Sequence, residues 1–117
     1  MTGTRYDPAA HAQAMRESGF WVDRNYDEFL QATIAQSPNK LALLAYRSDR
    51  AEGRRISYAE FGELISRAAA SLKRLGVGRG EVISVQLPNW WEFAVISLAA
   101  FRIGAIFNPL MPIFRER

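Results

Sequence analysis

The chain has 117 residues, a length that suits one domain, and it has no cysteine, which excludes disulfides, cysteine-ligated zinc and a thiol nucleophile. Apolar residues make up 49% and charged residues 23%, the balance of an ordinary globular protein, so a wholly disordered chain is excluded. The net charge of +3 is small and the arginines are spread over loops and helix faces, so we expect no nucleic-acid binding.

The longest nearly apolar stretch, residues 93–106, is interrupted by Arg102 and is shorter than the ~20 residues that span a bilayer. Residues 1–8 lack the apolar core of a signal peptide. We therefore expect no membrane span and, with no cysteine present, a cytoplasmic location.

The first half of the chain predicts two helices and two strands. A helix is expected over 8–17, opened by Pro8, and a second over 26–36, with Asn25 as N-cap and Glu28 three positions later. The apolar run 41–46 predicts a strand covered on both faces, and 54–58 is expected to pair back with it.

The loop between these strands is rich in charge. A solvated loop is the simpler interpretation and an anion-binding patch is the alternative. The residues concerned are Arg47, Asp49, Arg50, Glu52, Arg54 and Arg55.

The best-defined helix follows Ser57, which forms a capping box with Glu60. Its apolar residues recur with a 3.6-residue period, and Gly76 is expected just past its end. They are Phe61, Leu64, Ile65, Ala68, Leu72 and Leu75. Gly76, Gly78 and Gly80 follow a helix and precede a strand, so they indicate a turn, because a phosphate loop lies before a helix N-terminus.

The last part predicts a strand at 82–87, a helix from a cap at Asn89 to about Arg102, and a strand at 105–108 stopped by Pro109. This order is that of a right-handed parallel crossover.

The helix between Trp90 and Ile103 is apolar all round and requires cover on every side, and parallel strands require cover on both faces. The chain has too few elements to provide it, which indicates a piece of a larger sheet. We expect self-association through this helix or through the edge strand between Ala105 and Asn108.

No residue has the setting of a catalytic or ligand-binding group. His11 stands alone, and Ser57 and Ser84 lack the strand–nucleophile–helix context of an activated serine. Trp90 and Trp91 indicate packing, with a ligand or partner surface as the alternative. We therefore predict no catalytic, cofactor-binding or metal-binding residue in this chain.

Three stretches carry recognisable motifs. They are Ile-Ser-Tyr-Ala-Glu-Phe at 56–61, Leu-Gly-Val-Gly-Arg-Gly-Glu-Val at 75–82 with Leu-Pro-Asn-Trp-Trp-Glu-Phe at 87–93, and Leu-Ala-Ala-Phe-Arg-Ile-Gly-Ala-Ile-Phe-Asn-Pro-Leu at 98–110. In this order and spacing they resemble the adenylate-forming superfamily of acyl-CoA ligases, luciferases and peptide-synthetase adenylation domains. The first resembles its core Thr/Ser-Tyr-x-Glu-Leu and the last its core Gly-Ala-x-x-x-Pro, and the likeness runs from about Asn25 to the end.

The tail at 108–117 is more similar to bacterial ligases for medium-chain or alicyclic acids, such as cyclohexanecarboxylate-CoA ligase, than to peptide-synthetase domains, which usually have Leu-Asp-Pro and then Tyr-Pro here. The resemblance implies a parent enzyme that uses ATP and Mg²⁺ to turn an acid into an acyl-adenylate and then transfers the acyl group to CoA. Another adenylating branch remains an alternative.

The resemblance implies an α/β fold, a fragment of the large N-terminal domain with a small, mostly parallel sheet and packed helices. Residues 1–24 are then an N-terminal helical segment, and 25–117 the first part of the AMP-binding domain, ending before its phosphate-binding loop. The fragment is expected to be inactive alone and to bind no cofactor itself, with the remainder of the parent chain as its partner. A self-contained binding module is the competing interpretation.

Overall fold

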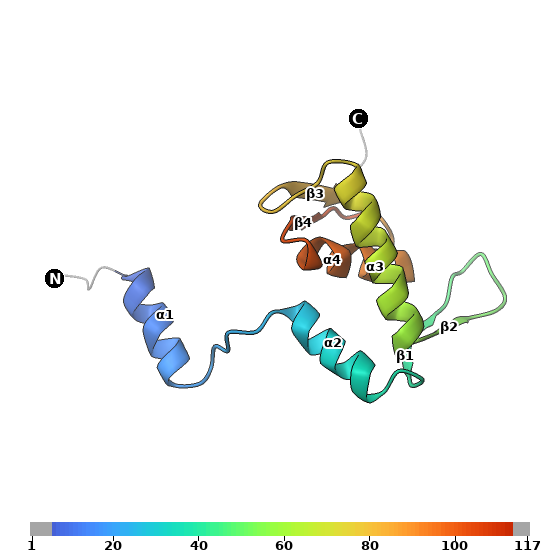
Figure 1. Cartoon of the computed structure of the whole chain (residues 1–117). Coiled ribbons are helices and arrows are strands. Elements are labelled where there is room, and N and C mark those ends of the chain that lie inside the picture. Colours follow the sequence, from blue (N-terminus) through green and yellow to red (C-terminus); the bar gives the residue numbers. More distant parts are fainter. Residues whose placement is uncertain (1–5, 114–117) are drawn as a thin grey trace.

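The computed structural model describes residues 6–113, so the first five residues, and the last four of the tail at 108–117, lie outside the described part. The elements follow the chain order expected from the sequence (Figure 1). They are α1 (Pro8–Glu17), α2 (Tyr26–Gln36), β1 (Leu41–Ala45), β2 (Arg54–Ser57), α3 (Tyr58–Arg74), β3 (Val82–Val85), α4 (Trp91–Arg102) and β4 (Ile106–Pro109).

The α/β class is confirmed. Within the described residues the strands form two two-stranded sheets, β1 with β2 and β3 with β4, where the sequence favoured one mostly parallel sheet. The β1–β2 pair is antiparallel and the β3–β4 pair is parallel, as the strand–helix–strand order predicts. The expectation that the first strand is covered on both faces is wrong, because Leu41 and Leu44 are 42% and 45% exposed.

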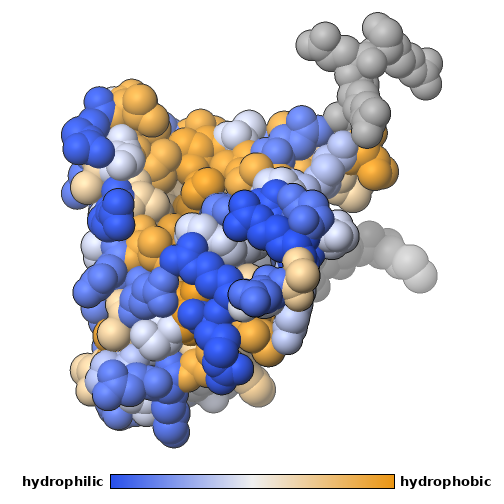
Figure 2. Space-filling view, turned by 90° about the vertical axis from the view of Figure 1, so that its right-hand side faces the viewer, coloured by the Kyte–Doolittle hydropathy of each residue, from blue (hydrophilic) through white to orange (hydrophobic). Residues whose placement is uncertain are grey.

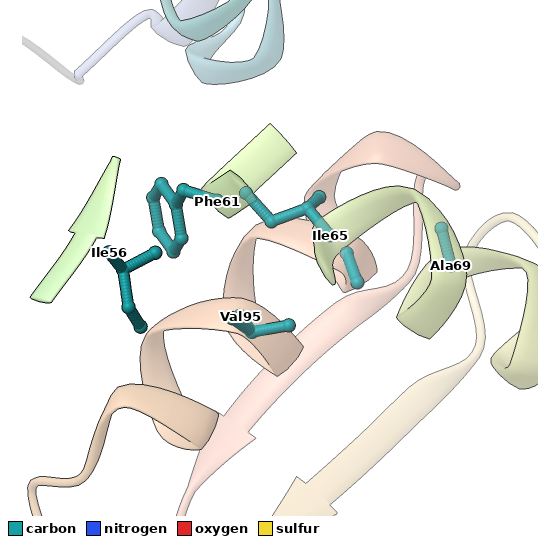
Figure 3. Close-up of a cluster of buried hydrophobic side chains, with 6 residues drawn as sticks. Ile56, Phe61, Ile65, Ala69 and Val95 are labelled. Carbon is teal, nitrogen blue, oxygen red and sulfur yellow. The ribbon is translucent and has the colours of Figure 1, made fainter. Parts of the chain in front are cut away.

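The core forms where β2, α3 and α4 meet (Figure 3). Ile56 from β2, Phe61 and Ile65 from α3, and Val95 from α4 point toward one another and are buried. The apolar period of α3 therefore has the predicted role. Leu75, the last residue of this apolar stripe, is the exception, because it is 80% exposed at the end of the helix.

Local hydrogen bonds define the ends of α2 and α3. Asn25 accepts from the backbone N–H of Glu28 at 3.0 Å, and Ser57 Oγ accepts from that of Glu60 at 3.2 Å. After α3 the chain turns at Gly76, which has φ of 89°. There Val77 N–H donates to the Leu72 carbonyl at 3.0 Å, a Schellman arrangement that confirms the turn interpretation of this glycine.

The predicted cap at Asn89 is wrong. Trp90 is the N-cap of α4, with φ −94° and ψ 164°, and no side chain caps this helix. Trp90 N–H donates to the Pro88 carbonyl at 2.7 Å, and this tight turn delays the helix by one residue.

Helix α1 lies apart from the other elements (Figure 1), and none of its residues is buried. The radius of gyration is 18.3 Å, against about 13 Å for a compact domain of ~100 residues. The described chain is therefore too open to be a closed globule. No helix in the described part has the length and apolar content to cross a membrane.

Candidate functional site

Two neighbouring tryptophans at the start of α4 each lie against an arginine of the β1–β2 hairpin. Arg47 Cζ is 3.7 Å from the ring centroid of Trp90, and Arg54 Cζ is 4.3 Å from that of Trp91. Both distances are within the range of cation–π attraction. The packing interpretation of the two tryptophans is therefore supported. The two arginine–tryptophan contacts connect the β1–β2 hairpin to the start of α4.

Both arginines also bind carboxylates. Arg47 donates to Asp49 through Nε at 3.0 Å, and Arg54 Nη2 donates to Glu60 at 2.6 Å. The hydrogen bond from Arg47 lowers the pKa of Asp49 below its ordinary value, and the same bond raises the pKa of Arg47. The solvated-loop interpretation is supported, since Arg54 and Asp49 are exposed, and the paired charges make a poor anion-binding patch.

An apolar cleft of about 330 Å³ lies where β3 and β4 end, beside the start of α4. Its lining residues are Leu87, Pro88, Asn89, Phe93, Pro109, Leu110, Met111 and Pro112. Ligands of open α/β sheets bind outside the carboxyl ends of parallel strands, which is the position of this cleft. Asn89 is the one polar side chain among these described residues, so the cleft offers apolar burial but no acid, base or cation.

The β3–β4 sheet is covered on one face. On that face Phe107 of β4 packs against Phe93 and Phe101 of α4, with ring centroids 5.3 Å and 6.2 Å apart. On the other face Val82 and Ile106 are direct neighbours in register and are 60% and 54% exposed. A parallel sheet with one bare apolar face is unusual, because such sheets are covered on both sides.

Helix α4 has more cover than its sequence indicated. Phe101, at 44%, is its one exposed large apolar side chain in the described structure. Figure 2 shows that apolar residues nevertheless reach the surface over a broad area of one side of the molecule, beside a dense group of hydrophilic residues. Val82 of β3 and Ile106 of β4 form the bare apolar surface of the sheet, and self-association stays a prediction.

Residues 6–113 contain no group of three or more His, Cys, Asp or Glu side chains placed to hold a metal ion, and no buried polar or charged residue. His11 is exposed and lies 5.6 Å and 5.8 Å from the rings of Tyr6 and Trp21. Ser57 serves as a helix cap, and Ser84 accepts from Asn108 Nδ2 at 3.0 Å. That this chain carries no catalytic residue stays a prediction.

Comparisons with known proteins agree on one family. The model of the AMP-binding enzyme family matches residues 30–117. The salicyl-AMP ligase / salicyl-S-ArCP synthetase of Mycobacterium tuberculosis is 39% identical over 99 residues, which are 85% of this chain and 17% of that protein. The medium-chain fatty-acid–CoA ligase of Escherichia coli is 34% identical over 103 residues, or 88% of this chain and 17% of that protein.

The solved structures agree. The apo structure of Mycobacterium smegmatis MbtA matches this chain with a TM-score of 0.79 and 36% sequence identity. The match covers 93% of this chain and 20% of the MbtA chain. The chain thus spans about a fifth of the length of the relatives it matches. From residue 30 to its last residue, this chain belongs to the AMP-binding enzyme family.

Proposed function

We propose that this chain is the first part of the N-terminal domain of an enzyme that activates a carboxylic acid and joins it to CoA. In the first step the carboxylate attacks the α-phosphate of ATP and pyrophosphate leaves. In the second the thiol of CoA attacks the acyl carbon and AMP leaves. Residues 25–117 belong to the adenylating domain in this proposal, and 1–24 form a helical segment ahead of it.

The family match over residues 30–117 carries the proposal. The geometry supports a structural part for the chain in this enzyme. Phosphate charge needs a cradle of cations and backbone donors, whereas the cleft at the strand ends is apolar and Arg47 and Arg54 are already paired with carboxylates. ATP and Mg²⁺ therefore do not fit the described residues, and we assign their binding to other parts of the enzyme.

A second candidate for the thiol step is transfer to a carrier protein after activation of an aryl acid. The similarity to a protein named salicyl-AMP ligase / salicyl-S-ArCP synthetase, at 39% identity, favours it. The similarity to a medium-chain fatty-acid–CoA ligase, at 34%, and the tail at 108–117 favour CoA. In either case we propose a cytoplasmic location, with which the cysteine-free composition is compatible.

The test is acid-dependent exchange of labelled pyrophosphate into ATP, catalysed by the longest polypeptide that the gene encodes. Exchange with octanoate or cyclohexanecarboxylate, followed by a CoA thioester, is the expected result. Exchange with salicylate and no CoA thioester would establish the aryl branch instead. No exchange with any acid of a broad panel would overturn the proposal.

A further inference from the structure

Arg47 has an exposed acid as its partner and a buried acid as its neighbour. Its side chain is 21% exposed, whereas that of its partner Asp49 is 60% exposed, so their ion pair faces solvent through Asp49. The second acid is Glu92, in the first turn of α4. Glu92 Oε2 is buried and accepts no hydrogen bond within residues 6–113. A buried oxygen without a donor is costly, which makes Glu92 an acceptor in need of a partner.

The charge of Glu92 acts on Arg47. The pKa of Arg47 is raised first by its hydrogen bond to Asp49, and the charges of Asp49 and Glu92 raise it further. The two bonds from Arg47 to Asp49, at 3.0 and 3.1 Å, come from Nε and Nη2. A guanidinium has five N–H donors, so the N–H groups of Nη1 remain for a second acceptor.

The ring of Trp90 supports Arg47 next to this second acceptor. Arg47 Cζ lies 3.7 Å from the ring centroid, and Trp90 precedes Glu92 by two residues at the start of α4. Cation–π attraction depends on the distance to the ring face, so a guanidinium can turn on the ring and keep it. A cleft of about 210 Å³ between β1 and the start of α4 leaves the hairpin room to approach.

The other charges around Arg47 do not compete for it. Arg50 is a cation, and its charge acts on Asp49. Arg54 Nη2 already donates to Glu60 at 2.6 Å. Asp49 and Glu92 are the acids whose charges act on Arg47 in the described structure.

We propose that Arg47 is a latch with two positions, bound to Asp49 in the described structure and to Glu92 in the alternative, and in contact with Trp90 in both. The Glu92 position draws the β1–β2 hairpin against the start of α4. Asn89 lines both the cleft beside β1 and the apolar cleft at the strand ends, so the movement changes the wall of both. The latch goes beyond the proposed function and does not depend on the reaction of the parent enzyme.

Ionic strength selects between the two positions. Salt screens an exposed ion pair strongly and a buried pair much less. The present pair reaches solvent at Asp49, whereas the alternative acceptor, Glu92 Oε2, is buried. Rising salt therefore weakens the first position more than the second and moves Arg47 toward Glu92. Loss of the Asp49 carboxylate has the same effect.

NMR of the full chain tests the latch with two matched variants. Asp49→Ala removes the acid that holds Arg47, and Glu52→Ala removes an equal charge from the same loop and keeps Asp49. The readout is the cross-peak between the side-chain protons of Arg47 and Glu92. We expect it to grow about fivefold or more in Asp49→Ala, because a minor conformation is at most ~10% populated before the shift. It should stay at its original intensity in Glu52→Ala.

A second cross-peak, between Arg47 and the ring of Trp90, should persist in Asp49→Ala, because the ring supports both positions. Its loss would show that Arg47 moves into solvent and would overturn the proposal. Equal Arg47–Glu92 intensities in the two variants would overturn it as well. In the unsubstituted chain, about 1 M salt should strengthen the Arg47–Glu92 cross-peak, and an unchanged or weaker one would also contradict the latch.

Discussion

Arg102 in the apolar helix α4 is expected to contribute to stability by joining three helices. Its side chain is 17% exposed and lies between α2 and α3. Nε donates to Asp27 Oδ1 at 2.7 Å, and Nη1 donates to Ser66 Oγ at 2.8 Å. Replacement by Met keeps the aliphatic volume and removes every one of these bonds.

The partial burial of the Arg102–Asp27 pair determines how much stability its loss should cost. An exposed ion pair contributes ~0–1 kcal/mol, and loss of one partner of a fully buried pair costs ~3–5 kcal/mol. The Asp27 side chain is 24% exposed, so the pair lies between these limits. A hydrogen bond to a charged group contributes about 1.5–3 kcal/mol. We therefore expect Arg102→Met to lower the free energy of unfolding by about 2 kcal/mol.

Urea unfolding followed by tryptophan fluorescence measures this loss. With a slope near 2 kcal/mol/M, the midpoint should fall by about 1 M. The matched control is Arg16→Met, because Arg16 pairs with Asp23, which is 86% exposed, and its loss should cost less than ~0.5 kcal/mol. If the two variants unfolded at the same midpoint, the interhelical role of Arg102 would be refuted.

Three further outcomes are expected. Ile65 is 0% exposed, so Ile65→Ala should cost ~2–5 kcal/mol and Ile65→Val ~0.5–1.5 kcal/mol in the same assay; equal losses would contradict its place in the core. Gly104 has φ of 75°, so Gly104→Ala should cost ~1–2 kcal/mol, seen as a lower Tm, and an unchanged Tm would exclude the left-handed turn. The carboxyl of Asp49 should titrate by NMR below its ordinary value of ~3.9, because Arg47 lowers its pKa. The stability from the Arg47–Asp49 pair is then present above pH ~4 and is lost as the pH falls through the lowered pKa. Arg47→Gln should return the NMR titration midpoint of Asp49 toward its ordinary value.

The helix boundaries were predictable because their causes are local. Asn25, Ser57 and Gly76 satisfy backbone groups within a few residues of themselves, so the printed sequence contains both partners of each bond. The Asn89 prediction failed for a local reason too, since the tight turn from Pro88 to Trp90 competes with a capping asparagine.

The features that depend on distant residues were not predictable. Arg102 looks in the sequence like an interruption of an apolar run, and its partner Asp27 is 75 positions away. The stacks of Arg47 on Trp90 and Arg54 on Trp91 depend likewise on how the hairpin meets α4. The sequence offered no candidate site and the prediction was that none is present, whereas the shortage of cover was visible as an excess of apolar residues over the elements able to bury them.

We propose that this chain is a structural part of an adenylating domain and that ATP binds to other parts of the enzyme. Calorimetric titration of Mg–ATP into the chain alone tests it most directly. We expect no heat of binding at micromolar or submillimolar ATP, because the described residues offer no phosphate cradle. Saturable binding with a micromolar Kd would contradict it.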